Sequence, residues 1–130
     1  MAAAPAYAAT PIAWTGLVPS TADTSWTAPT HVTTIGSAGA SGTKIVQVDV
    51  IPAGTVVAGL VNVFLFDGTS YHLHESVTIA AYTSSTTAAP PKQSFTYDNL
   101  VLPNGWSLVV ATTVSGNVSL VEVNAYGASL

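Results

Sequence analysis

The sequence predicts an all-β fold, an antiparallel β-sandwich of the jelly-roll kind with about seven or eight strands. Three observations predict it. Short runs rich in Val, Ile, Thr and Tyr alternate apolar and polar residues with a period of two. Turn residues interrupt these runs at intervals of roughly 8–12 residues, the spacing of sandwich strands. No stretch combines helical spacing of apolar residues with a capping residue.

The chain divides into an extended N-terminal arm, residues 1–11, and a single sandwich domain, residues 12–130. The arm consists mainly of alanine, and Pro5 and Pro11 favour extended backbone. Two interpretations stay open. The arm is a disordered tail, or it orders against a partner with Tyr7 and Trp14 as anchors.

The first strands are expected in residues 31–36, 43–51 and 56–66, after an irregular Pro/Thr-rich region at 15–30. Residues 43–51 alternate strictly, which indicates one wet face. Residues 56–66 are apolar on both faces, which indicates burial on both sides or in an interface. In 43–51 the expected partition places Val46, Val48 and Val50 on one face, and Gln47 and Asp49 on the other.

Asp67-Gly68 predicts a hairpin, in which a type I′ turn would give Gly68 a positive φ. The return strand is residues 70–79. Alternation along it predicts two sets of side chains: Tyr71, Leu73, Val77 and Ile79 inward, and His72, His74, Ser76 and Thr78 outward.

The remaining chain begins with a long exposed loop, residues 80–93. Two short strands, 94–97 and 99–102, flank Asp98-Asn99, and Pro103-Asn104-Gly105 forms a tight turn. A final hairpin of residues 106–114 and 117–126 then turns at Ser115-Gly116-Asn117.

Charge is scarce: only 6% of residues are charged, arginine is absent, and the formal charge is −4. Lys44 and Lys92 cannot form a basic stripe, so we expect no nucleic-acid partner and no anionic membrane surface. A surface with so little charge has weak protection against association. We therefore expect much of it to be covered by sister copies or by a larger assembly.

Cysteine is absent, so neither a disulfide nor a thiolate metal site is possible. The N-terminus lacks a positive region followed by a leucine-rich one, so we read no signal peptide. We expect synthesis in the cytoplasm.

Residues able to support catalysis or metal binding are few. His72 and His74, two apart on a strand, could reach one ion, but Glu75 would point the other way. Three copies around a threefold axis could pool their imidazoles. The simpler interpretation is a pair of outward polar residues, with no metal and no cofactor. The acids are dispersed and no nucleophile elbow is present, so we expect no enzyme. An enzyme would need Glu75 or Glu122 and a histidine to meet in a pocket.

The tryptophans divide into two groups. Trp106 opens a strand and is expected in the core or at its edge. Trp14 and Trp26 flank the irregular region and are candidates for an interface, where large aromatic residues dominate binding energy.

The segments VFLFDGTSYHLHESVTI and LVLPNGWSLVVATTV, with the terminal NAYGASL, resemble small β-sandwich proteins of tailed-bacteriophage particles over residues 43–127. The resemblance implies a virion component. By size it implies a capsid decoration, or cement, protein: a trimeric jelly roll that binds the major capsid protein on the outside of the head. The 80–93 loop and the missing arginine depart from that pattern, so a place in a tail or fibre stays open. The alternative function is a carbohydrate- or receptor-binding module there. Aromatic residues gathered in one concave patch would favour that alternative.

Overall fold

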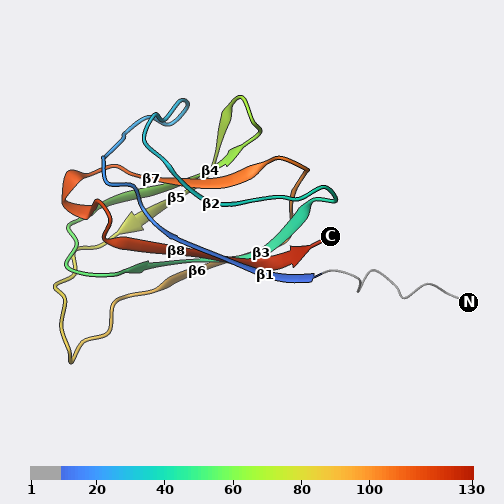
Figure 1. Cartoon of the computed structure of the whole chain (residues 1–130). Coiled ribbons are helices and arrows are strands. Elements are labelled where there is room, and N and C mark those ends of the chain that lie inside the picture. Colours follow the sequence, from blue (N-terminus) through green and yellow to red (C-terminus); the bar gives the residue numbers. More distant parts are fainter. Residues whose placement is uncertain (1–9) are drawn as a thin grey trace, which may run out of the picture.

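The computed structural model describes residues 10–130, which form two four-stranded antiparallel sheets packed face to face (Figure 1). Sheet A has the order β1-β8-β3-β6, and sheet B the order β2-β7-β4-β5. No α-helix occurs within residues 10–130. The elements are β1 (Thr10–Leu17), β2 (Thr33–Ser37), β3 (Thr43–Pro52), β4 (Gly59–Phe66), β5 (Tyr71–Ile79), β6 (Gln93–Leu102), β7 (Ser107–Thr112), the 3-10 helix η1 (Ser115–Asn117) and β8 (Val121–Ser129).

The strand pairing is nested. β1 pairs with β8, β2 with β7, β3 with β6 and β4 with β5, all antiparallel. A single long hairpin rolled up across the two sheets has this pattern, which is the topology of the jelly roll. The fold class predicted from the sequence is therefore confirmed.

The core lies between the two sheets and consists mostly of valine, whose branched side chain suits a pleated surface. Alternate residues of every long strand point into it. Partly buried aromatic side chains, Trp106 among them, pack around its margin, as the sequence predicted for Trp106. The fully buried members include Ile45, Val48, Val50, Val61, Val63, Leu102, Leu108, Val110, Val121, Val123 and Ala125.

One edge of the sandwich is closed by Trp14 of β1. Its half-buried ring packs against the core and lies so close over Gly36 of β2 that a Cβ there would overlap the ring. Glycine is needed at this close approach. The ring is thus partly buried within its own sandwich, while contact of Trp14 with a partner stays a prediction.

The outer face of sheet B carries a second apolar cluster. Phe64, Val109 and Ala111 are fully buried there, with Val32, Phe66 and Tyr71 packed against them. Residues 18–32, between β1 and β2, run across this face in Figure 1. Burial of sheet B on both sides matches the apolar pattern of residues 56–66.

The predicted arm was too long. β1 begins at Thr10, and Thr10 and Pro11 pair with Ser129 and Ala128 of β8. Alternation of alanine, proline and threonine with Ile12 and Trp14 gave no recognisable strand signal, so β1 was missed. Tyr7 lies outside the described residues.

Two bulges change which side chains face inward. In β3 the register shifts between Ile45 and Gln47, so Val46 is 43% exposed while Val48 and Val50 point inward. In β5 the shift falls at His74. Val77 and Ile79 face inward as predicted, but Tyr71 and Leu73 face outward and His72 and Glu75 face the interior side, because one extra residue reverses the alternation.

Two further connections differ from the sequence interpretation. Residues 93–102 form one strand, because the irregular Asp98-Asn99 segment is a bulge within β6. The last two strands are joined by η1, in which the Asn117 amide pairs with both backbone groups of Val57, at 2.8 Å each. The Asn117 side chain thus supplies the two hydrogen bonds that a neighbouring strand would otherwise make to the backbone of Val57.

The β4–β5 hairpin has a four-residue loop, Asp67–Ser70, instead of a type I′ turn. Gly68 has φ +99° as expected, but it is the only residue of this loop with positive φ. Asp67 Oδ1 accepts the backbone N–H groups of Thr69 at 2.8 Å and Ser70 at 2.7 Å, which fixes the loop.

We expect Gly68→Val to lower the free energy of unfolding by about 1 kcal/mol or more, because valine rarely adopts positive φ. No atom lies within 4 Å of the position where the Cβ would be, so the cost is conformational only. Urea unfolding measures it. Thr69→Val, which puts the same side chain on the neighbouring residue, should be nearly neutral. Equal effects would contradict the assignment.

Candidate interaction surfaces

Within residues 10–130 no pocket opens on the surface, and no three His, Asp or Glu side chains meet as metal ligands. No helix of this part is long and apolar enough to cross a membrane. The candidate sites of the described chain are therefore three regions of its surface. These are the edge between β5 and β6, the segment 19–31, and the outer face of sheet A.

The β5–β6 edge holds both candidate histidines, but the bulge separates their environments. The His72 ring stacks on Trp106, with centroids 6.1 Å apart and planes at 17°, and its Nε2 lies 3.0 Å from Asp67 Oδ2. Asp67 has its pKa lowered to about 2, first by the Ser70 backbone N–H and then by His72. His72 is therefore occupied by contacts within its own chain.

His74 lies against Tyr97 of β6, with ring centroids 5.0 Å apart, and its Nε2 is buried with no hydrogen-bond partner. Tyr97 donates its hydroxyl to Glu75 Oε1 at 3.2 Å. Burial, and then the Glu75 charge, raises the pKa of Tyr97. This pairing accounts for Glu75, which the structure does not bring together with Glu122.

The segment 19–31 is folded around the carboxylate of Asp23. Asp23 Oδ1 accepts the Ser25 N–H at 2.9 Å, and Oδ2 accepts the N–H groups of Thr30 at 2.7 Å and His31 at 3.1 Å. Its own N–H donates to the Thr112 carbonyl of β7 at 2.8 Å. These bonds lower the pKa of Asp23 to about 2, with the Ser25 N–H the largest cause.

Trp26 is presented on this organised segment. Ser25 Oγ accepts the N–H groups of Thr27 at 3.4 Å and Ala28 at 2.9 Å, so the backbone on both sides of Trp26 is hydrogen-bonded. Trp26 itself is 48% exposed. The structure thus keeps the sequence-predicted Trp26 available on the surface, on a hydrogen-bonded segment.

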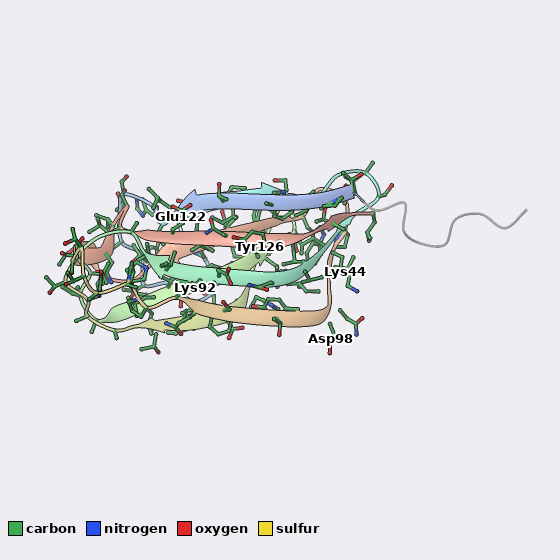
Figure 2. All side chains as sticks on the ribbon, turned by 90° about the horizontal axis from the view of Figure 1, so that it is seen from below. Lys44, Lys92, Asp98, Glu122 and Tyr126 are labelled. Carbon is green, nitrogen blue, oxygen red and sulfur yellow. The ribbon has the colours of Figure 1, made fainter. Side chains whose placement is uncertain are left out.

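The outer face of sheet A is covered by no segment of the described chain, and Figure 2 looks onto it. Tyr126 of β8 lies near its middle and is 37% exposed. The outward residues are Pro11, Ala13, Thr15 and Leu17 of β1; Glu122, Asn124, Tyr126 and Ala128 of β8; Lys44, Gln47, Asp49 and Ile51 of β3; and Ser94, Thr96, Asp98 and Val101 of β6.

This face concentrates the charge of the protein. The chain has two lysines and six acidic residues. Both lysines and three of the acids, five of the eight charged residues, belong to this face: Lys44, Asp49, Lys92, Asp98 and Glu122.

At the centre of the face, Asp49 is only 5% exposed although it points outward. Gln47 Nε2 donates to its Oδ1 at 2.8 Å, and Lys92 Nζ lies 3.9 Å from its Oδ2. Asn124, with its amide nitrogen turned toward the acceptors, donates to Glu122 Oε1 at 3.1 Å. The polar groups are held in fixed positions by their neighbours.

Reasoning from the sequence did not select this surface. Tyr126 and Asn124 were placed in a strand but given no role, because alternation shows that a residue points outward and not whether anything covers it. The two lysines, although far apart in sequence, were the available signal for a charged face. Only the strand order places them on one face.

Comparison with known proteins gives no relative: no protein-family model, no curated protein and no solved structure matches this chain.

We expect Asp23→Ala to lower the free energy of unfolding by about 1–2 kcal/mol, because three backbone N–H groups lose a charged acceptor. Urea unfolding measures this loss. Thr24→Ala, in the same segment, is the matched control, since the Thr24 side chain is exposed and makes no hydrogen bond to the described residues. An Asp23 variant as stable as the Thr24 variant would contradict the assigned role.

The same carboxylate predicts a pH dependence. Because the folded-state pKa of Asp23, about 2, lies below its ordinary value of 3.8, its contribution is complete above about pH 4 and is lost as the pH falls toward 2. Amide chemical shifts of Ser25, Thr30 and His31 should titrate together in that range. Titration near pH 4 would refute the hydrogen-bond pattern.

Proposed function

We propose that this protein is a non-enzymatic structural component of a phage virion, which binds the outside of an assembled capsid as an oligomer and stabilises it. The observation that carries the proposal is the nested jelly-roll topology, a fold used by viral capsid proteins and also by lectins and cupins. Because fold alone does not give function, the distribution of charge and aromatic residues must support it as well.

The charge distribution supports a protein that works in an assembly. Only 6% of the residues are charged, and Thr, Ser, Ala and Gly take the place of charged residues in the composition. Covering uncharged polar groups with another protein costs less desolvation free energy than covering charged ones. A protein that binds the assembled shell and not its separated subunits stabilises the shell by mass action. Many equivalent sites on one lattice strengthen the effect.

Trp26 is the side chain best suited to contact the capsid. It combines large apolar area with little loss of freedom, because Asp23 and Ser25 already fix the surrounding backbone. Pre-organised aromatic residues of this kind contribute most of the energy of an interface. In this proposal the protein recognises the capsid protein mainly through the segment that carries Trp26.

The alternative, a glycan-binding module, needs several aromatic residues on one patch with polar groups between them. Among residues 10–130, the exposed aromatic residues lie apart instead. Tyr126 is on the outer face of sheet A, and Trp26 is on the segment that covers sheet B. This separation favours the capsid role.

The test mixes the purified protein with empty heads of the phage whose genome encodes it and measures bound copies per head. We expect saturation at a fixed stoichiometry and heads that resist heat better. Absence of binding to heads, combined with binding to a glycan array, would establish the alternative.

In that assay we expect Trp26→Ala to weaken binding at least about tenfold, as for a hot-spot aromatic residue. The free energy of unfolding should fall by no more than about 1–2 kcal/mol, because about half of the side chain is exposed. Trp26→Phe is the matched control and should retain most of the binding. Unchanged binding by Trp26→Ala would remove the residue from the interface.

A further inference from the structure

We propose that the outer face of sheet A is a self-complementary surface, on which two copies of this protein pack face to face around a twofold axis. The partner is a second copy of the chain. The pairing does not depend on the proposed function, since it uses a different surface from Trp26 and needs no capsid.

The first argument is that no segment of the described chain crosses this face. On the outer face of sheet B, in contrast, Phe64, Val109 and Ala111 are buried beneath the chain between β1 and β2, although Leu73 of β5 stays 41% exposed. On sheet A, apolar groups stand in the open beside polar ones: Leu17 is 39% exposed, Val101 47% and Tyr126 37%. A contact on this face would bury these side chains, with Tyr126 close to its centre, where hot spots lie.

The second argument is the order of charges at the two ends of the face. At one end, Lys44 of β3 pairs in register with Ala128 and Val101, and Asp98 lies beyond it on the edge strand β6. At the other end, Glu122 of β8 pairs with Ile51, and Lys92 lies beyond it, immediately before β6. Figure 2 shows the two pairs at opposite ends.

Read from β8 toward β6, one end is therefore positive then negative, and the other is negative then positive. A twofold axis running across the strands in the plane of contact turns one end of the face onto the other. It keeps the β8 side of one copy over the β8 side of its partner. Lys44 then faces the Glu122 end and Asp98 faces the Lys92 end, with opposite charges opposed.

The pattern is specific to this symmetry. A twofold axis that runs along the strands would instead place each end of the face over the same end of the partner copy. Lys44 would then lie over Lys44 and Glu122 over Glu122, and these contacts are repulsive. Two stacked sheets commonly incline their strands by about 30°. Such an inclination shifts the inner-strand Lys44 toward Glu122 of the partner copy and away from Lys92. The charges thus select one register among those that the flat face would allow.

The centre of the face fits the same arrangement. Asp49 pairs with the Lys92 ammonium and accepts a hydrogen bond from Gln47 within its own copy, so it does not face the partner as a bare charge. Tyr126 and Asn124 occupy successive outward positions of β8. The twofold axis passes between these two positions, so it places Tyr126 of one copy over Asn124 of the other. Each Tyr126 ring would therefore pack over the Asn124 side of the other copy, and both would leave water together.

The experiment is a charge swap measured by sedimentation equilibrium of the full chain in low salt, without capsids. The unaltered protein should form a dimer. Lys44→Glu and Glu122→Lys should each weaken dimerisation at least about tenfold, because each creates two like-charge contacts per dimer.

The decisive step is to mix the two single variants. One copy then carries two acids and the other two lysines at these positions, so both contacts are restored in a mixed dimer. We expect a one-to-one heterodimer about as tight as the unaltered dimer, and we expect the double variant in one chain to dimerise equally well. A general loss of folding in either variant would prevent this recovery.

Thr69→Lys adds a lysine at the exposed β4–β5 loop, away from the face, and serves as the control. It should leave dimerisation unchanged. A monomer, or a trimer whose mass and stability none of these variants alters, would overturn the proposal. So would single variants that fail to recover on mixing. Because capsids are absent, these outcomes are separate from failure of the capsid-binding assay.

Discussion

The structure depends on the burial of sheet B on both of its faces. β4 and β7 carry apolar side chains on both faces, so one face forms the core and the other is unfavourable in contact with water. The chain solves this with residues 18–32, which lie over Phe64, Val109 and Ala111. A loop in that position needs its backbone polar groups satisfied. The Asp23 carboxylate accepts three of them and so makes the cover possible.

The different coverage of the two sheets determines where the polar residues lie. Sheet B uses uncharged groups at its buried positions, for example Asn62, which accepts the Ser76 hydroxyl at 2.8 Å. Sheet A, covered on one side only, carries both lysines and three of the acids on its open side. The few charges of the chain are thus concentrated where their positions can select a partner and a register.

The sequence was sufficient to predict the fold class and most strands, because alternation in residues 43–51 and turn residues such as Asp67-Gly68 are local signals. It failed where a single inserted residue mattered. The bulge at His74 reverses the direction of His72, and nothing in the local sequence marks it. β1 was missed because its only large inward side chains are Ile12 and Trp14, and Trp14 rests on Gly36, which is distant in sequence. The sheet A face could not be predicted, since it requires the strand order.

The four outer strands explain why contacts between copies should use a face and not an edge. An open edge invites another strand to pair with it. β1 carries Pro11, which cannot donate to a new ladder, and β2 is short and bulged. β5 is interrupted at His74, and β6 between Thr96 and Leu100. Each edge is thus protected against strand addition, whereas the flat, ordered face of sheet A is not. These protected edges therefore fit our proposal that copies of the chain pair through the open face of sheet A.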